Sequence, residues 1–297
     1  MLALMTIIAL AYSSMTRNES LLSYNGLRSA QAREKAESGI WLVINDLLKP
    51  INNRRFLVNG LPVQLGAIYP EDESVQDLLI SIQDESGKID LNKASQQLLL
   101  GLLRSTGVDS DQSHQIVDAI LDWRDKDNLS RLNGAEDDDY AANGLSYGAK
   151  DGPFNSIGEL QQVLGLSPSI YQKLQPLLTV HSLQSRIRLH TAPIGVLKAL
   201  PDMSDELLAQ IISERSTMDT TPLSLVVPDA SKTLVFTSGQ GRVFSITSEA
   251  KVSGVTSRLL VTFALKKSNN MPITILDWQE NAPLLTYQPE TELEHNQ

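Results

Sequence analysis

The chain opens with an apolar run that passes into a long charged stretch without a helix-breaking residue. Residues 1–16 carry no charge and are mostly Leu, Met, Ile and Ala, and no proline occurs before Pro50. At about 1.5 Å per residue, a helix reaching Lys49 would be roughly 70 Å long, more than one globular domain uses. Its late part has one apolar face, made by Ile40, Trp41, Ile44, Leu47 and Leu48. We therefore expect a long helix that packs on a folded domain only near its end.

The apolar opening of this helix is a candidate membrane anchor. Residues 1–15 would span only about 22 Å as a helix, less than the roughly 30 Å of a hydrocarbon core. A secretory signal peptide would begin with Lys or Arg, and none precedes this apolar run. The pattern favours an anchoring or packing helix, with a cleaved signal and an ordinary buried helix as alternatives.

Alternating apolar residues predict strands on both sides of a helical block. The alternation covers Leu61, Val63 and Leu65, then Ile80 and Ile82, and it returns after residue 233. There one face carries Phe244, Ile246, Ser248, Ala250 and Val252, and Ser253-Gly254 predicts a hairpin turn into a further strand. Between about residues 92 and 216 the apolar spacing is helical, which predicts helices and loops only. A single sheet built from both strand regions makes the helical block an insertion.

This pattern predicts an α+β fold, in which a long N-terminal helix packs on a small antiparallel sheet and a large all-α domain is inserted into the sheet region. The expected parts are a membrane-embedded helix start (1–20), the rest of the helix with the first strands (21–91), an inserted helical domain with an acidic loop (92–232), C-terminal antiparallel strands (233–282) and a flexible tail (283–297).

A weak internal repeat lies in the helical block. Residues 89–95 match residues 187–193, and each copy predicts an extended leading segment, polar capping residues and an amphipathic helix, with Pro193 tolerated in the first turn. The pattern is similar to helix-hairpin-helix modules, which bind DNA phosphate. However, Asp202, Ser204 and Asp205 stand where the second hairpin would need glycine. Together with the formal charge of −10, these residues argue against a nucleic-acid partner.

The densest group of carboxylates lies between the two copies. It consists of Asp122, Asp125, Asp127, Glu136, Asp137, Asp138 and Asp139. So many carboxylates repel one another unless they are solvated or bridged by a cation, and Ca²⁺ accepts six to eight oxygen ligands in flexible geometry. The candidate calcium ligands are Asp125, Asp127, Asn133, Glu136, Asp137 and Asp138. The loop does not follow the EF-hand pattern, so a solvated acidic loop, magnesium or a basic protein partner remain as alternatives.

Composition and missing motifs exclude several other classes of protein. The 297 residues are 41% hydrophobic and 20% charged, which is ordinary for a folded chain, and the absence of cysteine excludes a disulfide scaffold. The 4 histidines are scattered without metal-ligand spacing, and no nucleophile elbow or phosphate-binding loop occurs. We predict no enzyme, no catalytic residues and no small-molecule substrate.

Several stretches, taken in order, carry a family resemblance. They are residues 82–92, 121–127 with 133–138, 152–154 with Glu159 and Leu160, and 189–193 with Val196 and Leu197, while residues 36–39 look like the late part of a pilin helix. In these stretches the chain resembles the type II secretion system protein K family, the large minor pseudopilin of the general secretion pathway.

The resemblance implies a pilin-like fold with an inserted helical domain that binds calcium near its acidic loop. It also implies a single-pass inner-membrane protein with its bulk in the periplasm, at the pseudopilus tip in a complex with the minor pseudopilins I and J. There it would help initiate or cap assembly for export of folded proteins across the outer membrane. A type IV pilus minor pilin and a helix-hairpin-helix DNA-binding module are the alternatives.

The start of the chain departs from that family. Family members begin with a short basic leader, a Gly before the prepilin peptidase cut and a full apolar span, and none of these precedes Met1. We therefore expect the apolar opening to be the lower part of a longer pilin-type helix.

Overall fold

The computed structural model describes residues 2–216, 227–236, 241–266 and 271–282, and the chain forms two compact units. Unit 1 contains Met1–Phe56, Leu61–Ile82 and Ser245–Gln297. Unit 2 contains Leu57–Gly60 and Gln83–Phe244. The tail expected from residue 283 onward lies outside the described residues.

Unit 1 begins with the predicted long helix, α1 (Leu2–Leu47), which is 46 residues long. Its late part buries one face made by Ala32, Ala36, Ile40, Val43, Ile44 and Leu47. Gly39 allows close packing on the sheet, because a Cβ there would lie 3.0 Å from Ile80 Cδ1 and 3.1 Å from Ser248 Oγ. The helix is present as the sequence predicted, and Ile40, Ile44 and Leu47 of the predicted face are buried. The prediction is wrong for Trp41 and Leu48, each of which is 45% exposed.

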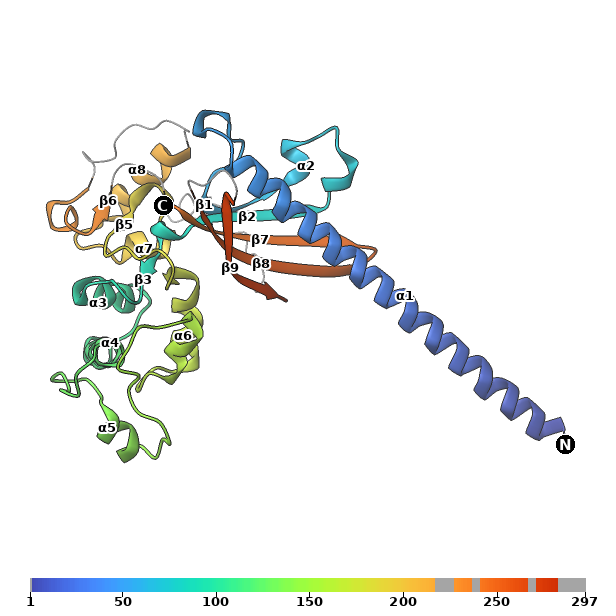
Figure 1. Ribbon diagram of the computed structural model, residues 1–297, viewed down its shortest axis with the longest axis horizontal. Helices are drawn as coiled ribbons and strands as arrows, with labels where there is room; N and C mark the ends of the chain where they lie inside the picture. Colours follow the sequence, from blue (N-terminus) through green and yellow to red (C-terminus); the bar gives the residue numbers. More distant parts are fainter. Residues whose placement is uncertain (1, 217–226, 237–240, 267–270, 283–297) are drawn as a thin grey trace. The chain divides into compact units, whose positions relative to one another are not determined.

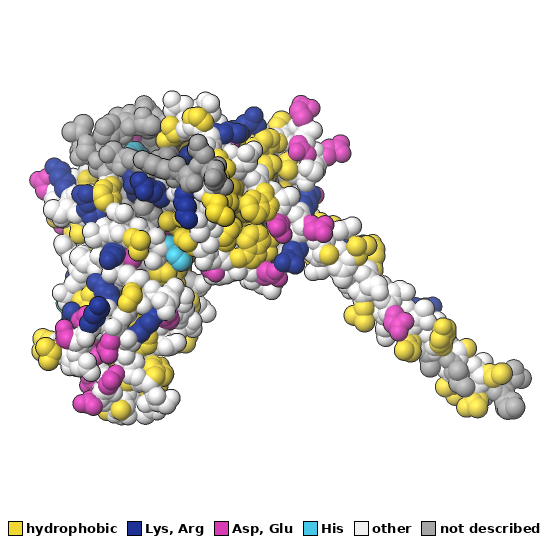
Figure 2. Space-filling model, in the orientation of Figure 1, with side chains coloured by type: hydrophobic (Ala, Val, Ile, Leu, Met, Phe, Trp, Pro, Cys, Tyr) yellow, Lys and Arg dark blue, Asp and Glu magenta, His cyan; other side chains and the backbone are white. Residues whose placement is uncertain are grey.

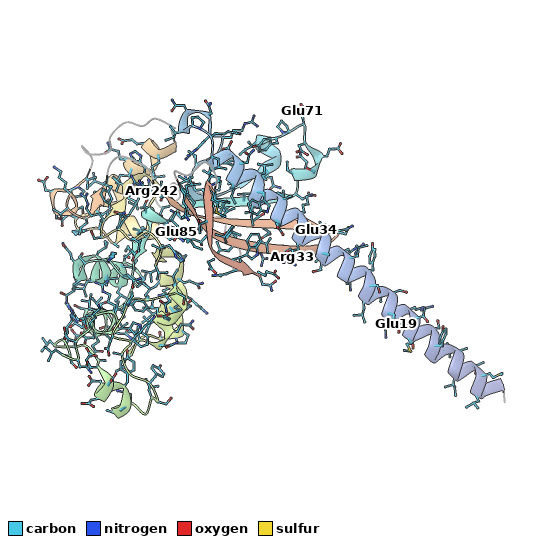
Figure 3. The ribbon with its side chains drawn as sticks, in the orientation of Figure 1. Glu19, Arg33, Glu34, Glu71, Glu85 and Arg242 are labelled. Carbon is cyan, nitrogen blue, oxygen red and sulfur yellow. The ribbon has the colours of Figure 1, made fainter. Side chains whose placement is uncertain are left out.

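The early part of α1 extends past the sheet strands (Figure 1). Its apolar side chains, among them Leu4, Ile7 and Leu10, are exposed, and hydrophobic side chains are scattered along this segment in Figure 2. Glu19 lies on this exposed segment, and farther along the helix Arg33 forms an ion pair of 2.5 Å with Glu280 (Figure 3). Among the described residues, no helix is both long enough and apolar enough to cross a membrane.

A five-stranded sheet has the order β1-β2-β7-β8-β9. The strands are β1 (Asn59–Gln64), β2 (Leu78–Asp84), β7 (Val243–Val252), β8 (Val255–Leu265) and β9 (Ile273–Glu280). The predicted hairpin joins β7 to β8 through Ser253 and Gly254, with φ angles of 48° and 87°. Strand β9 pairs antiparallel with β8, with a bulge between Thr262 and Phe263. The sheet therefore combines strands from both ends of the chain, as the alternation predicted.

Short helical segments connect the first strands of unit 1. They are η1 (Ile51–Asn53), α2 (Leu65–Ile68) and η2 (Glu73–Val75). Leu65, the last residue of the predicted alternation, begins α2 and is buried there. The alternation therefore predicted the strand correctly but placed its end one residue too late.

Unit 2 is mostly helical. Its helices are η3 (Glu85–Gly87), α3 (Gln96–Ser105), α4 (Ser110–Arg124), α5 (Asp137–Ala142), η4 (Ile157–Gln162), α6 (Pro168–Leu174), η5 (Gln175–Leu177), η6 (Leu189–Thr191), α7 (Ile194–Lys198), α8 (Asp205–Ser216) and η8 (Asp229–Ser231). The aromatic rings of Trp123, Tyr140 and Phe154 lie together in its core, with centroids 5.9 Å and 6.1 Å from that of Trp123.

The prediction of a block with helices and loops only is wrong in one respect. Two short parallel strand pairs occur in unit 2: β3 (Ile89–Asp90) with β4 (Leu178–Thr179), and β5 (Ile187–Arg188) with β6 (Val235–Phe236). In each pair the leading segment of one repeat copy joins a segment from much later in the chain. Two residues are too few for a period-2 pattern, so the sequence could not predict these pairs.

The internal repeat is present in the structure and extends beyond the matching residues. In the first copy, Arg124 at the end of α4 donates to the carbonyl oxygens of Leu91 and of Ala94, the latter at 2.8 Å. In the second copy, Arg215 near the end of α8 donates to those of Leu189 and of Ala192, the latter at 2.8 Å. The four carbonyls occupy equivalent positions in the leading segments of the two copies. Each helix pair is thus closed by an arginine from its second helix.

The helix starts and hairpins of the two copies differ in detail. The side chain of Ser95 caps α3 by accepting from Leu98 N at 3.3 Å, whereas Pro193 lies one residue before α7 and makes no side-chain cap. Each hairpin has a left-handed residue, Gly107 with φ 85° and Asp202 with φ 56°. A carboxylate therefore occupies the glycine-like position of the second hairpin, as the sequence suggested.

Candidate functional site

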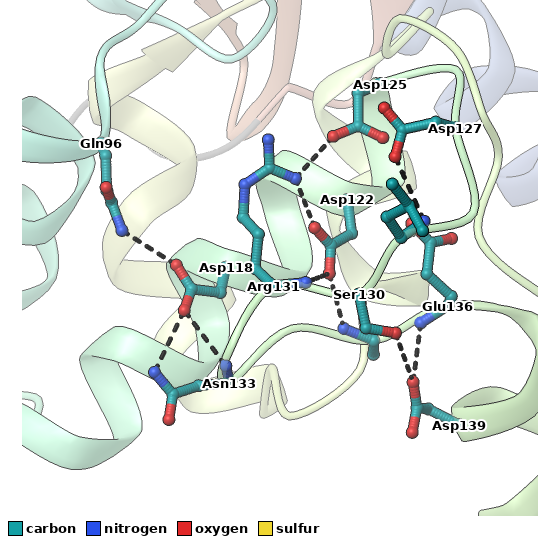
Figure 4. Close-up of polar contacts among 12 residues, drawn as sticks. Gln96, Asp118, Asp122, Asp125, Asp127, Ser130, Arg131, Asn133, Glu136 and Asp139 are labelled. Atoms are coloured by element: carbon teal, nitrogen blue, oxygen red, sulfur yellow. Dashed lines mark hydrogen bonds and ion pairs between the residues drawn. The ribbon is translucent and has the colours of Figure 1, made fainter.

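The acidic segment follows α4 and leads into α5, and polar contacts fold it back on α4 (Figure 4). Asp118, on the third turn of α4, is a buried anchor that accepts from Asn133 N at 3.3 Å and Asn133 Nδ2 at 3.1 Å. Gln96 Nε2 donates to the other oxygen of Asp118 at 2.9 Å. The amide group of Asn133 is thus used as a donor to a carboxylate.

Arg131 ties the segment to two further carboxylates. It forms an ion pair with the fully buried Asp122 and another, at 2.5 Å, with Asp125 Oδ2. Asp122 Oδ2 also accepts from the backbone N–H groups of Arg131 at 3.2 Å and Ala135 at 3.0 Å. Burial raises the pKa of Asp122, and these contacts with Arg131 partly offset that rise.

Gly134 is required at this point of the loop. A Cβ on Gly134 would lie 1.8 Å from Asp122 Oδ2 and 3.2 Å from Arg131 N. The absence of a side chain lets the backbone close over the buried carboxylate. This gives a structural reason for the Asn-Gly pair in the sequence.

Glu136 is the electrostatically exceptional residue of the site. Its side chain is buried, with 5% of the residue exposed, and neither carboxylate oxygen has a hydrogen-bond partner among the described residues. Its pKa is raised from 4.5 to about 7, mainly by burial and in addition by the negative charges of Asp122, Asp125 and Asp151. A carboxylate in this position favours either a proton or a metal cation.

Two other carboxylate oxygens near Glu136 are also buried without a hydrogen bond. Asp125 Oδ1 and Asp151 Oδ1 are buried and have no hydrogen-bond partner within the described parts of the chain. Asp151 adopts a left-handed conformation with φ 52°, which is uncommon for a residue with a side chain. Four buried carboxylate oxygens from three residues therefore lack hydrogen bonds near a single electrostatic cluster.

The structure brings only part of the predicted ligand set to this cluster. Asp125 and Glu136 belong to it, whereas Asp137 and Asp138 are exposed on α5. Asp127 is exposed and accepts from Leu129 N at 3.2 Å, and Asn133 is bound to Asp118. Within the described ranges, no three Asp, Glu, His or Cys side chains are arranged as a metal site. Calcium binding by this loop stays a prediction.

Two acidic residues at the cluster were not among the predicted ligands. Asp122 lies inside α4, where helical periodicity assigns it no special role, although its place in the acidic run is visible in the sequence. Asp151 lies far from the loop in sequence, next to Gly152-Pro153. The one local signal for it is this turn-forming run, which gives no direction for its carboxylate.

Comparison with known proteins identifies the region that contains this site. Residues 72–182 match the family model described as type II secretion system (T2SS), protein K. This region belongs to the type II secretion system protein K family. The family is a structural component of that secretion system, and the resemblance found from the sequence is confirmed.

Curated relatives with the name type II secretion system protein K match parts of the chain. The protein of Pectobacterium carotovorum subsp. carotovorum is 39% identical over 75 residues, which cover 25% of this chain and 23% of the relative. That of Klebsiella pneumoniae is 34% identical over 80 residues, covering 27% and 24%. That of Pseudomonas aeruginosa is 27% identical over 149 residues, covering 47% and 44%. The chain thus aligns with less than half the length of each of these relatives.

A solved structure matches nearly the whole chain. It is the crystal structure of the GspK-GspI-GspJ complex from the enterotoxigenic Escherichia coli type 2 secretion system, with a TM-score of 0.57 and 18% sequence identity. The match covers 91% of this chain and 100% of the other. At this identity the likeness shows the fold: a long N-terminal helix and an antiparallel sheet combined with further helices.

Proposed function

We propose that this chain is a minor pseudopilin of the type II secretion system. It acts at the pseudopilus tip in a complex with the I and J pseudopilins and helps to initiate or cap assembly for export of folded proteins across the outer membrane. The observation that carries the proposal is the protein K match of residues 72–182 within a chain whose 46-residue helix α1 packs on a sheet. The match to the GspK-GspI-GspJ structure supports the choice of partners.

The cap role rests on unit 2 acting as an inserted domain. Residues 83–244 form most of unit 2, and the chain returns to the sheet through β7 after them. We propose that this unit, helical apart from its short strand pairs, is the bulky insertion that obstructs addition of a subunit above it. A pseudopilin that ends a filament needs such an obstruction, whereas one inside the filament does not.

The early part of α1 would anchor the chain in the inner membrane, with the bulk in the periplasm. Support comes from the absence of charge in residues 1–16 and from the exposed apolar side chains of Leu4, Ile7 and Leu10. Carbonate extraction of membranes from the native host tests this proposal. Recovery of the full chain in the carbonate-soluble fraction would contradict an anchor.

We further propose that the acidic cluster binds calcium. Asp125 and Glu136 from the predicted set, with Asp151, would supply the oxygen ligands, and all three are hard carboxylate donors of the kind Ca²⁺ prefers. The unpaired oxygens of Glu136 are the main support, because a buried carboxylate without hydrogen bonds is costly unless a cation or proton neutralises it. The outlying candidates Asp127, Asn133, Asp137 and Asp138 would not be ligands in this arrangement.

Reconstitution of the complex tests the proposed function. A fragment that starts at Arg28 is mixed with the I and J pseudopilins of the same genome, also without their apolar starts, and is analysed by size-exclusion chromatography with light scattering. We expect one peak containing all three chains. Separate elution of the fragment would contradict the proposal, and complex formation with type IV minor pilins instead would assign the alternative class.

A further inference from the structure

In the loop between α4 and α5, apolar side chains are exposed while polar side chains make contacts within the unit. Leu132 is 97% exposed and Leu129 is 76% exposed. The polar residues between and after them, Ser130, Arg131 and Asn133, use their side chains for contacts with carboxylates of the same unit. In an ordinary surface loop the apolar side chains turn inward and the polar ones meet solvent.

These polar contacts fix the direction of the leucines. Ser130 Oγ donates to Asp139 Oδ2 at 3.2 Å, and Arg131 bridges Asp122 and Asp125. Ion pairs and hydrogen bonds thus hold Ser130 and Arg131, which lie between the two leucines in sequence, against carboxylates of the same unit (Figure 4). Because the loop is already ordered, a partner that covers the leucines pays little conformational entropy.

Exposed acidic residues lie along the sequence on both sides of the leucines. Asp127 precedes Leu129, and Asp137 and Asp138 follow at the start of α5. Figure 2 shows acidic, basic and hydrophobic side chains side by side over the α4–α5 end of unit 2, and the exposed Lys126 precedes Asp127, so the acidic residues are in excess but not alone. Single exposed leucines are ordinary on protein surfaces, but two on a rigid loop with an acidic surround resemble the centre and rim of an interface.

We propose that Leu129 and Leu132 form a docking knob, which inserts into an apolar pocket with a Lys- and Arg-rich rim on another protein. The acidic surround selects a basic rim and disfavours nucleic acid and anionic lipid surfaces, which repel carboxylates. The knob itself does not require calcium, since the Arg131 ion pairs hold the loop without a metal. This proposal rests on the proposed function in one respect only: the test below is made in a cell that secretes protein by this system.

The test uses the full chain in its own bacterium with the chromosomal gene deleted. The double variant Leu129→Ser/Leu132→Ser is compared with Leu183→Ser, which removes a leucine that is 66% exposed elsewhere in unit 2. Secreted protein in the medium and the melting temperature of the purified chain are measured for each. We expect the double variant to melt as the wild type does and to lower secretion about tenfold or more, while Leu183→Ser secretes normally.

Photocrosslinking from position 132 gives a readout that is independent of secretion. A benzoylphenylalanine at this position should yield a discrete protein product that disappears with Leu129→Ser and weakens with Asp127→Asn/Asp138→Asn. Failure of the wild-type gene to restore secretion would count against the proposed function, whereas a Leu129-dependent crosslink would still support the knob.

Several outcomes would overturn the knob. Normal secretion by the double variant would do so, as would an equal loss with Leu183→Ser. A clear fall in the melting temperature of the double variant would show that Leu129 and Leu132 pack within the chain. Leucine-dependent binding of the wild type to phosphatidylglycerol vesicles would assign a lipid surface in place of a protein pocket.

Discussion

Replacing Glu136 by glutamine should have opposite effects on stability without and with calcium. In the calcium-free protein the pKa of Glu136 is raised from 4.5 to about 7, so the folded state holds a proton that the unfolded state releases at lower pH. The stabilisation from that proton is complete below about pH 4.5 and is lost as the pH rises through about 7. At pH 8 the folded wild type therefore carries an uncompensated buried charge, which Glu136→Gln removes.

The size of this effect follows from the shift. At about 1.4 kcal/mol per pKa unit the full shift corresponds to about 3 kcal/mol, and screening by nearby solvent reduces it to about 1–2 kcal/mol. At pH 8 without calcium we expect Glu136→Gln to be more stable than the wild type by this amount, or by about 2–6 °C in melting temperature. At pH 5 the two proteins should melt within about 1 °C of each other.

Calcium should reverse the order at pH 8. A ligand that binds only the folded state at about 100 times its dissociation constant adds about 2.7 kcal/mol of stability. The wild type gains this, whereas the variant has lost a charged ligand and gains much less. Scanning calorimetry at pH 5 and pH 8, with EGTA or millimolar calcium, measures all four conditions.

The matched control is Asp138→Asn, which removes the same charge from an exposed position on α5. It should leave both the pH dependence and the calcium response close to those of the wild type. A Glu136→Gln variant that is less stable than the wild type at pH 8 without calcium would refute the electrostatic reasoning. An equal calcium response in the variant and the wild type would refute the role of Glu136 as a ligand.

Substitutions at Arg215, Gly101 and Ser248 test the packing, with Arg215→Lys and Gly26→Ala as controls. Arg215→Met should cost about 2–4 kcal/mol in urea unfolding, because it leaves the carbonyls of Leu189 and Ala192 without their donor, and Arg215→Lys should recover only part of this. Gly101→Ala should lower the melting temperature, because the new Cβ would lie 2.1 Å from the backbone oxygen of Ala199. In the control Gly26→Ala the new Cβ has no neighbour within 4 Å, so the higher helix propensity of alanine should stabilise the protein by up to about 1 kcal/mol. Ser248→Ala should be neutral or stabilising by up to about 1 kcal/mol, since its buried Oγ has no hydrogen-bond partner among the described residues, and a loss above that range would show a missed contact.

The long periodic elements of this fold could be predicted from the sequence. The helix α1 and the strands of the β7–β8 hairpin each extend over 10 or more residues. The helix is signalled by a long run without proline and by apolar spacing near its end, and the hairpin by alternation around a Ser-Gly turn. The parallel pairs β3–β4 and β5–β6 could not be predicted, since each has 2 residues per strand and depends on a distant partner. Long-range pairing is not encoded in local spacing.

The acidic site, too, could be predicted from the sequence only in part. The sequence located the loop, because a run of carboxylates is visible without any structure. It could not assign ligands, because Asn133 turns to Asp118 while Asp151 approaches from a left-handed turn far along the chain. Which oxygens stay unpaired depends on Arg131, whose guanidinium neutralises Asp122 and one oxygen of Asp125 but leaves Glu136 without a partner.

The acidic site is built on one copy of a duplicated scaffold. Both helices of the second copy are shorter than those of the first, with 5 residues against 10 and 12 against 15. In an antiparallel helix pair, the second helix runs back toward the start of the first. When both helices are shorter, the last turn of the second helix still ends beside the segment that leads into the first. Arg215 therefore reaches the carbonyls that are equivalent to those bound by Arg124. The arginine closure is thus common to both copies and independent of helix length.

In the first copy, carboxylates join this closure at two helix positions that are uncharged in the second copy. Counted back from each arginine, Asp118 and Asp122 of α4 correspond to Ala209 and Ser213 of α8, which cannot anchor an acidic loop. Asp125 follows Arg124 directly, so the bonds of Arg124 to the leading segment also fix where the acidic loop begins. Loss of the Arg124 closure should therefore disturb the site as well as the fold, whereas loss of the Arg215 closure should lower stability and leave calcium affinity in the folded protein unchanged. Calcium titrations of Arg124→Met and Arg215→Met, at a temperature where both are folded, separate these two effects, and equal losses of affinity would contradict the assignment of the site to the first copy.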